Sequence, residues 1–488
     1  MKIRGTSKIF AGLFIASLLL ASCKSTELTL QDRETQLPPN FENVVAATDE
    51  SSVALLNWQN FFADEQLKNL VQVALDNNQD HLKTLERIRV FRANYKIAKG
   101  GLLPEVNALA GASVRRFGEY TMDGVGNADS NLSPTVPADK QIPDPYRDFI
   151  VGAQFSWEVD VWSKLRNRKK AAFARYLASE EMVNAIKTWL VGEVSQQYFE
   201  LVALDEEIRI LEANIQLQEF AVNLSKDLKE SGKENQLAVD QFEALMLNSK
   251  AQLVDRKREL RTAELQMAQL LGVYDFQHVR NTMAEVFGTP DLVDVGLPAE
   301  LLAYRPDIRM AERELLATKA EVQAARAAFF PSIQLGGMAG FNAFDFSRLF
   351  FSPASTVYQL GAGLVAPVFN RNQIRMDFEA AKAGQKIAYL DYEQTIFKSY
   401  LEVLNLVNEF SAFDEQLQLK TYEVEVQKRS VENSNIMFRV GYADYLEVLN
   451  AQTNALQSEM ELIELKKNQL QANVRLYRAL GGGWMVGD

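Results

Sequence analysis

Residues 149–161 read FIVGAQFSWEVDV, and residues 163–231, which follow almost at once, contain no proline. In the first stretch apolar and polar side chains alternate, which is the period of a β-strand with two unlike faces. One face carries Phe149, Val151, Ala153, Phe155, Trp157, Val159 and Val161, and the other carries Gln154, Ser156, Glu158 and Asp160. In the second stretch apolar residues recur every three or four positions, which predicts a helix on the order of 100 Å long at ~1.5 Å per residue. Strands therefore alternate with helices much longer than those of a globular domain.

The same pattern occurs twice, with an offset of about 209 residues between the two copies. Matching segments are Leu165-Arg166 with Ile374-Arg375, Ala203-Leu204-Asp205-Glu206 with Ala412-Phe413-Asp414-Glu415, Gly232 with Gly441, and Leu271-Gly272 with Leu480-Gly481. Each half reads as strand, loop, strand, long helix, tight turn and second helix. The chain is therefore an internal repeat and not a series of unrelated domains.

The repeat sets the expected boundaries along the chain. The first repeat covers 58–272, with strands at 104–117 and 148–161 and helices at 163–231 and 237–271. A connection at 273–303 leads to the second repeat, 304–481, with strands at 331–343 and 356–368, helices at 371–440 and 445–480, and a tail at 482–488. Segments 118–146 and 344–355 are expected to be loops at the same end of the sheet. The fold class is mixed: mainly α, with a small β part.

The four strands are long enough for membrane-barrel strands, which need about 9 to 11 residues. An ordinary soluble sheet with one buried face fits the alternation equally well. In a membrane, four strands cannot close a wide barrel, and open edges would leave backbone groups unpaired. Three copies would form a closed barrel of twelve strands, with Phe155 facing lipid. The long helices alone would also fit a coiled coil that forms a passive rod.

The amino terminus has the layout of a secretory signal, expected to span residues 1–22. Basic residues precede an apolar stretch from Ile9 to Leu20 that is too short for an ordinary membrane-spanning helix. Cys23 follows Leu-Ala-Ser and is the only cysteine of the chain. This string resembles a bacterial lipoprotein box, which implies that Cys23 carries a covalent lipid at the start of a segment covering 23–57. The alternative is a plain secretory signal with an incidental cysteine.

The composition and motifs argue against several functions. Lys and Arg number 52 and Asp and Glu 64, so no basic face for nucleic acid is expected. The only histidines are His81 and His278, and no spacing predicts a metal site. No phosphate-binding loop or serine elbow occurs. The carboxylates of 205–207 are interpreted as a solvated helix face. We therefore expect no enzyme, and no cofactor apart from the lipid on Cys23.

Several strings in the second half resemble one known family. They are Tyr304-Arg305-Pro306-Asp307-Ile308-Arg309, Ala328-Phe329-Phe330-Pro331-Ser332-Ile333, Tyr358-Gln359-Leu360-Gly361 with Pro367-Val368-Phe369-Asn370, and Gly441-Tyr442-Ala443-Asp444-Tyr445-Leu446-Glu447-Val448-Leu449-Asn450-Ala451. They resemble the outer-membrane efflux lipoproteins of the TolC-like superfamily, especially the NodT-type components of resistance-nodulation-division (RND) pumps. The resemblance extends from about Trp58 to Gly481. One departure is Asn370-Arg371-Asn372, which replaces the family's usual glycine-containing turn.

The resemblance implies a homotrimer with a twelve-stranded transmembrane β-barrel in the outer membrane and an α-helical tunnel across the periplasm. A mixed equatorial belt would draw on 58–77, 271–302 and the last residues. The implied partners are a periplasmic adaptor protein and an inner-membrane RND-type transporter, which supplies the energy. The protein would be a passive exit duct for antibiotics, detergents, dyes or metal ions. A structural envelope-spanning lipoprotein without transport activity is the alternative.

The resemblance also implies a gate just beyond the second helix turn. In that family the helix after the turn narrows the tunnel, which here points to Leu446, Glu447 and Asn450. Leu446 and Asn450 share a helix face, whereas Glu447 is displaced by about 100°. The turns at Gly232 and Gly441 are the candidate adaptor contacts. The alternative for Leu446 is a packing residue of a coiled coil.

Overall fold

The computed structural model describes Pro38 and residues 56–276, 280–287 and 298–485. The chain divides into two units, 1–38 and 39–488, and the elements below all belong to the second. Cys23 and His278 lie outside the described residues. No helix within the described ranges is long and apolar enough to cross a membrane.

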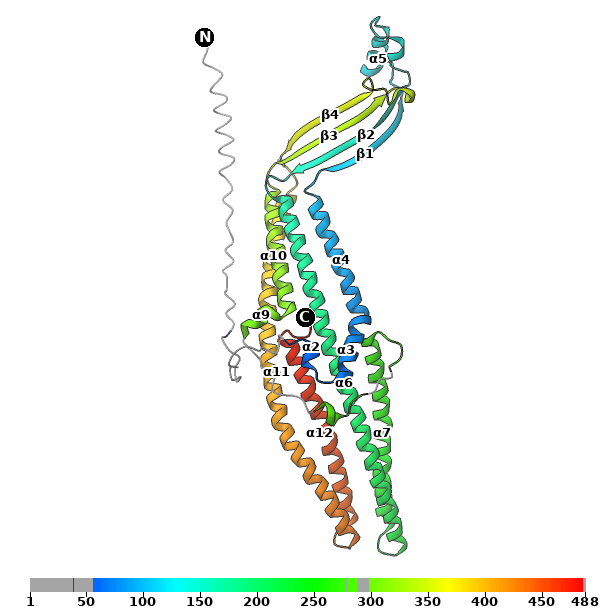
Figure 1. Cartoon of the computed structure of the whole chain (residues 1–488), viewed down its shortest axis with the longest axis vertical. Coiled ribbons are helices and arrows are strands. Elements are labelled where there is room, and N and C mark those ends of the chain that lie inside the picture. Colours follow the sequence, from blue (N-terminus) through cyan, green and yellow to red (C-terminus); the bar gives the residue numbers. More distant parts are fainter. Residues whose placement is uncertain (1–37, 39–55, 277–279, 288–297, 486–488) are drawn as a thin grey trace. The chain divides into compact units, whose positions relative to one another are not determined.

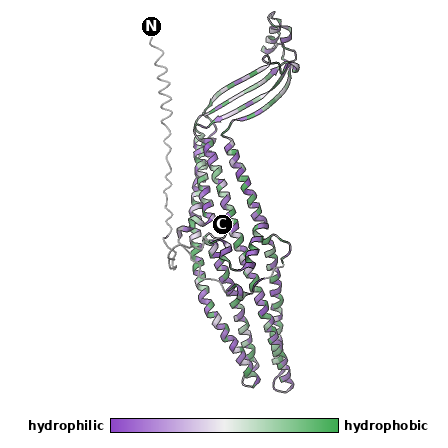
Figure 2. Ribbon diagram, viewed as in Figure 1, coloured by the Kyte–Doolittle hydropathy of each residue, from purple (hydrophilic) through white to green (hydrophobic). Residues whose placement is uncertain are grey.

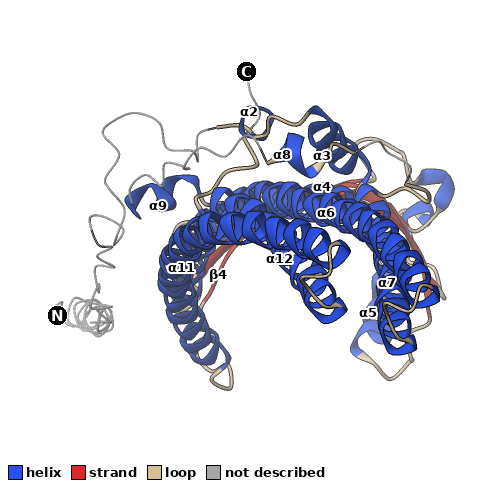
Figure 3. Cartoon of the chain, turned by 90° about the horizontal axis from the view of Figure 1, so that it is seen from below, coloured by secondary structure: helices blue, strands red, loops and turns tan. Residues whose placement is uncertain are grey.

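Two hairpins of long helices form the largest elements of the chain (Figure 1). In the first hairpin α6 (Lys164–Glu230) turns into α7 (Gln236–Leu271), and in the second α11 (Gln373–Arg439) turns into α12 (Tyr445–Ala479). α6 also packs against α4 (Gln79–Gly100), α10 (Pro306–Ala327) and α12, whereas α11 packs against α10 and α12. Seen from below, these helices form a curved row (Figure 3).

The sheet contains four antiparallel strands in chain order: β1 (Glu105–Arg115), β2 (Tyr146–Val159), β3 (Ser332–Ala343) and β4 (Thr356–Val365). β2 ends before Asp160 because that carboxylate accepts hydrogen bonds from the backbone N–H groups of Leu165 and Arg166, which starts α6. β4 ends before Pro367, which cannot donate to a strand ladder. β1 and β4 each leave one edge unpaired in the sheet of the described residues.

No residue of the four strands is buried within the protomer. Within the described part of the chain the sheet is a single layer without helices over either face (Figure 1). A soluble sheet with one buried face would bury every second residue of its strands. That alternative for the strands is therefore wrong.

The main core lies along the middle of α6, where the helix is enclosed by its neighbours. Leu190, Val194, Tyr198, Leu201 and Leu211 are almost fully buried. Towards the sheet, Ala171 and Ala174 pack on Ala317 of α10, because small side chains let two helix backbones approach closely. Polar and apolar residues are mixed along both hairpins (Figure 2). α6 is buried all round at its middle, whereas α11 buries only scattered residues.

Short elements gather around the middle of the helices, the region expected to form a belt. They are α2 (Trp58–Phe61), α3 (Glu65–Asn77), α8 (Met283–Val286), a 3₁₀ turn at Pro298–Glu300 and α9 (Leu301–Tyr304). The ring of Phe61 stacks on Tyr477 at 3.9 Å, and the Tyr477 hydroxyl donates to the carbonyl of Leu56 at 2.6 Å. The start and end of the described chain are thus joined here.

Arg305 connects this region to the second hairpin. Its guanidinium donates to both carboxylate oxygens of Asp307, to Glu402 of α11 at 2.8 Å and to the carbonyl of Ala479 at the end of α12, also at 2.8 Å. Pro306 begins α10, where a missing N–H has no cost. The string Tyr304–Asp307 is therefore a structural junction of three helices.

One loop expectation is wrong in part. Segment 118–146 contains a helix, α5 (Met122–Leu132), and a 3₁₀ turn at Ala138–Lys140. The Thr121 hydroxyl caps α5 by accepting a hydrogen bond from the Gly124 N–H. Helix propensity did not predict this helix, because it contains two glycines, Gly124 and Gly126.

Candidate functional site

The two hairpin turns have the same backbone geometry at positions 209 residues apart. Gly232 has φ +76° and Gly441 has φ +80°, the left-handed conformation that costs glycine least. The N–H of Lys233 donates to the Leu228 carbonyl and that of Tyr442 to the Met437 carbonyl, both at 2.9 Å. Both turns are therefore Schellman-type helix ends that reverse the chain tightly.

The helix after each turn begins with a side-chain cap. The carbonyl oxygen of the Asn235 side chain accepts from the Ala238 N–H at 3.1 Å, and Asp444 accepts from the N–H groups of Leu446 and Glu447 at 2.9 and 3.1 Å. These bonds fix the register of the first turn of α12. Leu446, Glu447 and Asn450 therefore project from a rigid helix end.

Near the turns the two hairpins pack against each other through a tip cluster. It consists of Ala221, Val222, Phe242, Phe438 and Val448. The rings of Phe242 and Phe438 lie 6.4 Å apart. Burial of these side chains holds the ends of the first and second hairpins together.

The gate candidates lie on the other side of α12. Val448 is 1% exposed within the tip cluster, whereas Leu446 is 42% exposed. Glu447 and Asn450 are exposed as well. Leu446 is thus not a core residue of the single protomer. All three side chains are free to contact another protein copy or the solvent.

Farther along, buried charges link α12 to α6. Lys467 of α12 lies 3.1 Å from Glu200 of α6 and 2.7 Å from Glu464, with its side chain only 11% exposed. Burial opposes the charge of Lys467, but the two carboxylates outweigh it and raise its pKa. The Lys467 side chain is largely shielded from water, whereas those of Glu200 and Glu464 are 35% and 52% exposed, so the surrounding water weakens the attraction between the charges.

Glu207 belongs to the same region and corrects one sequence interpretation. The run 205–207 was expected to be a solvated face, but Glu207 is 7% exposed. Burial raises the pKa of its carboxyl, although Arg256 Nε lies 3.2 Å away and works in the opposite direction. Glu207 Oε2, the atom that faces Arg256, accepts no hydrogen bond from the described residues. In the second repeat Asp414 and Glu415 are exposed, as expected.

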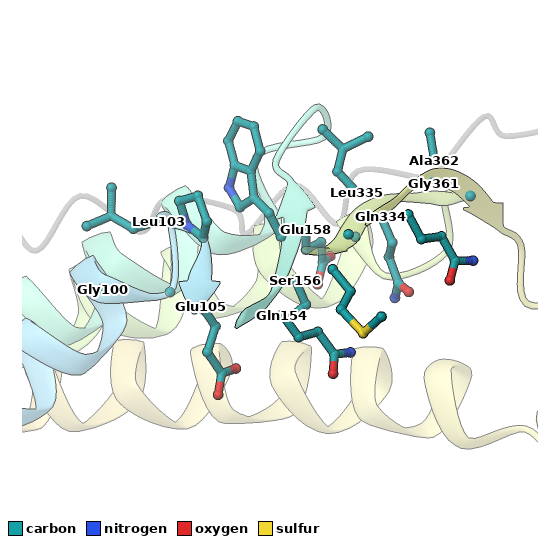
Figure 4. A pocket seen from close by; sticks show the side chains of 18 residues that line it. Gly100, Leu103, Glu105, Gln154, Ser156, Glu158, Gln334, Leu335, Gly361 and Ala362 are labelled. Atoms are coloured by element: carbon teal, nitrogen blue, oxygen red, sulfur yellow. The ribbon is translucent and has the colours of Figure 1, made fainter. Parts of the chain in front are cut away.

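The sheet places polar and apolar side chains on opposite faces. The register aligns Asn107, Gln154, Met338 and Gln359 in one row across the four strands, and Val106, Phe155, Gly337 and Leu360 in the neighbouring row on the other face. A groove of about 1020 Å³ lies at the end of the sheet nearest the helices. In Figure 4, Glu105, Gln154 and Gln334 point to one side of the strands and Leu335 and Ala362 to the other.

Aromatic side chains gather beyond both ends of the strands. At the helix end, Trp162 stacks on Phe330 at 4.8 Å and donates through Nε1 to the Pro331 carbonyl. At the loop end, Tyr146 contacts both Phe117 and Phe344 edge to face. An apolar strand face between two aromatic groups is the arrangement of a barrel strand in a bilayer.

Comparison with known proteins identifies the family. The model of the family described as "Outer membrane efflux protein" matches residues 70–273 and 297–482, which correspond closely to the two repeats. The chain belongs to the outer membrane efflux protein family. It is therefore a channel protein of the outer membrane that serves efflux, and not an enzyme.

Relatives of this outer membrane efflux protein are similar over nearly their whole length. It is 32% identical to the pyoverdine export outer membrane protein OpmQ of Pseudomonas putida KT2440 over 88% of both chains. It is 28% identical to the cation efflux system protein CusC of Escherichia coli K12 over 96% of this chain and 98% of CusC. A crystal structure of CusC superposes with a TM-score of 0.78 at 25% identity, covering 92% of this chain and 97% of that one. The TolC-like fold expected from the sequence is confirmed.

The comparisons leave the individual site residues as predictions. The structure places Leu446, Glu447 and Asn450 on one exposed helix end and Gly232 and Gly441 in equivalent turns. Cys23 lies outside the described residues. Sequence reasoning missed Glu200, Arg256 and Lys467, because no local pattern indicates which helix faces lie against each other.

Proposed function

We propose that this efflux channel works as a homotrimeric ring, in which each protomer supplies four strands to a twelve-stranded barrel. The observation that carries the proposal is the pair of unpaired edges on β1 and β4. Unpaired backbone groups cost several kcal/mol each in lipid. Pairing β4 of one copy with β1 of the next removes both edges, and only a closed ring removes all of them.

The helices support the same arrangement, because the two outer helices of the protomer carry exposed apolar residues. On α7 these include Leu247 and Val254, which are seven residues apart. On α11 they include Leu390 and Phe397, also seven apart, and Leu419, which is 68% exposed. A seven-residue spacing places side chains on one seam, as in helices that pack side by side. Neighbouring copies would cover these seams.

We place the strands across the outer membrane and the hairpins in the periplasm. The apolar strand face would contact lipid, and the row containing Gln154 and Gln359 would line the lumen. The tips of the hairpins, with Gly232 and Gly441, would meet the periplasmic adaptor, which connects to an inner-membrane RND-type transporter. The relatives are named for pyoverdine and for cations, so we assign the choice of cargo to the transporter and a passive role to the duct.

Three copies of α12 would bring Leu446, Glu447 and Asn450 together around the axis. A ring of Leu446 would form an apolar constriction and a ring of Glu447 or Asn450 a polar one. The exposure of all three side chains in the protomer supports this gate, because residues packed within the protomer could not line a pore.

The ring is tested by the mass of the protein purified in mild detergent, measured by native mass spectrometry. We expect three copies. A stable, monodisperse monomer in a native-like bilayer would contradict the proposal, because it would leave the edges of β1 and β4 unpaired in lipid.

The lipid on Cys23 is tested separately. Metabolic labelling with a radioactive fatty acid should mark the wild type and not Cys23→Ser. Equal labelling of both proteins would contradict the assignment of the lipid to Cys23. The unlipidated variant should retain part of its function, since the barrel provides its own membrane insertion.

A further inference from the structure

The helix in the β1–β2 loop has an unusual distribution of side chains. α5 turns its polar and small residues, Asn127, Asn131 and Gly124, partly inward. It turns its large apolar residues to solvent: Met122 is 88% exposed, Val125 58% and Leu132 82%. At 100° per residue these three lie within about 80° of one another, which makes a narrow apolar face.

Hydrogen bonds fix this orientation. The Asn131 side chain donates to the Ile142 carbonyl and accepts from the Ile142 N–H, both at 2.8 Å. A Cβ on Gly124 would lie 2.1 Å from the carbonyl oxygen of Gly118, so only glycine fits where the helix meets its own loop. The helix therefore cannot roll to bury its apolar face without breaking these contacts.

An eleven-residue helix is marginal in water without packing, and no residue of α5 is buried among the described residues. A second exposed apolar group lies in the β3–β4 loop. Phe350 and Phe351 are 62% and 67% exposed, while Leu349, which precedes them in the chain, is 1% exposed. The ring of Phe350 also meets that of Phe341 on β3 edge to face, with centroids 5.6 Å apart. The Ser355 hydroxyl donates to the Arg348 carbonyl at 2.7 Å and holds this loop in a compact form.

Topology connects each of these two surfaces to one edge strand of the sheet. α5 follows the edge strand β1, and Phe351 precedes the edge strand β4. Arg348 binds Asp139 at 2.8 Å, which ties the later part of the β1–β2 loop to the β3–β4 loop of the same copy. In a ring that joins β4 to β1, Phe351 of one copy comes next to α5 of the following copy.

The charge around α5 argues against a membrane surface as its partner. Glu119, Asp123 and Asp129 are acidic, and residues 117–139 contain no lysine or arginine. An anionic lipid surface would repel such a segment. The β3–β4 loop, with Asp345 balanced by Arg348, carries no net charge over 344–355 and offers aromatic rings to the apolar face of α5.

We infer that α5 and the Phe350–Phe351 pair form a clasp between neighbouring copies, outside the strands, which closes the ring at the loop end. The inference rests on the proposed ring. It assigns a function to a helix that the single protomer leaves uncovered: each copy supplies Met122, Val125 and Leu132 to one neighbour and the two phenylalanines to the other. The contact repeats three times around the channel mouth.

Cysteine cross-linking of the full-length trimer in membranes tests the clasp. Cys23 is the only native cysteine, so Leu132→Cys with Phe351→Cys, in a Cys23→Ser background, gives unambiguous products. We expect oxidation to produce bands of two and three copies on a denaturing gel. The control pair is Ser130→Cys with Phe351→Cys, because Ser130 is exposed on α5 about 160° away from Leu132. It should give few or no such bands.

Three outcomes would overturn the inference, and they differ from failure of the ring. If native mass spectrometry shows a trimer but Leu132→Cys forms no cross-link, the proposed clasp is wrong and the proposed ring stands. Equal cross-linking at Ser130 would indicate loose loops without a defined contact. A fluorescent bimane label on Leu132→Cys that shifts to the blue in vesicles of anionic phosphatidylglycerol, without cross-linking, would assign the helix to the membrane surface. A protein that is not a trimer would remove the clasp together with the proposed function.

Discussion

The two long helices α6 and α11 occupy equivalent positions in the repeat but differ in their surroundings. α6 is buried through its middle, from Leu190 to Leu211, because α4, α7, α10 and α12 surround it. α11 buries only scattered residues and exposes Ile387, Phe397 and Leu419. Ile210 is 8% exposed, whereas Leu419, 209 residues later, is 68% exposed. The two equivalent helices therefore differ in position: α6 lies in the interior of the protomer and α11 on its flank.

The largest difference in unfolding free energy should appear between Ile210 and Leu419 when each is truncated to alanine. Ile210→Ala removes a buried side chain and should lower the free energy of unfolding by about 2–5 kcal/mol. Leu419→Ala should change the unfolding of the protomer little and reduce the fraction of trimer after dilution in detergent. Guanidinium unfolding followed by circular dichroism and native mass spectrometry measure the two effects. An equal loss of unfolding free energy in both variants, with trimer unchanged, would show that α11 is not a flank helix.

The two faces of the sheet offer a similar contrast within one strand. Phe155→Arg places a charge on the apolar face and should cost about 2–4 kcal/mol if that face meets lipid at mid-depth. Gln154→Arg, its neighbour on the polar face, should cost much less, because the lumen contains water. Reversible unfolding of the two variants from lipid vesicles measures the loss of folding free energy in each. If Gln154→Arg is the more costly variant, the assignment of the faces is reversed.

A smaller effect is expected at Glu207, whose matched residue in the second repeat is Gln416. Burial raises the pKa of Glu207 above its ordinary value of 4.5. The folded state therefore holds this proton more tightly than the unfolded state, and stability falls as pH rises from about 4.5 through the raised pKa. Glu207→Gln should remove this fall and raise the melting temperature at pH 7. Thermal scans from pH 4.5 to 7 measure it; an unchanged pH slope would show that Arg256 fully compensates the burial.

The repeat explains how much of this fold the sequence could predict. Gly232 and Gly441 could be assigned as turns because three features point to the same positions: the glycine itself, the length of the preceding helix and the offset of the repeat. The replacement of a family glycine by Asn370-Arg371-Asn372 also has a physical reason. Asn372 has φ +62° and Ser163, its repeat partner, φ +64°. Asparagine tolerates this left-handed conformation better than most residues.

Other parts depend on contacts that no local pattern contains. The sequence pattern did not single out α4 and α10, since α4 exposes apolar residues such as Val90 and Ile97 and lacks one clear apolar face. The burial of Glu207 depends on α7 and α12, which lie far away in the sequence. The apolar face of α5 is exposed in the protomer, so its proposed contact can be recognised only when a second copy is placed beside the first. The candidate gate was predicted from the resemblance, and its exposure is the new observation.

Single-channel conductance of the purified trimer in a planar bilayer tests the central claim most directly. Leu446→Ser with Asn450→Ser should raise conductance markedly, with little change in melting temperature, because both side chains are exposed at the end of the second hairpin. Leu237→Ser, at the matched position of the first hairpin and 55% exposed, should leave conductance unchanged. A double variant without conductance would contradict the channel, and a double variant that loses stability at unchanged conductance would make Leu446 a packing residue between copies and not a gate.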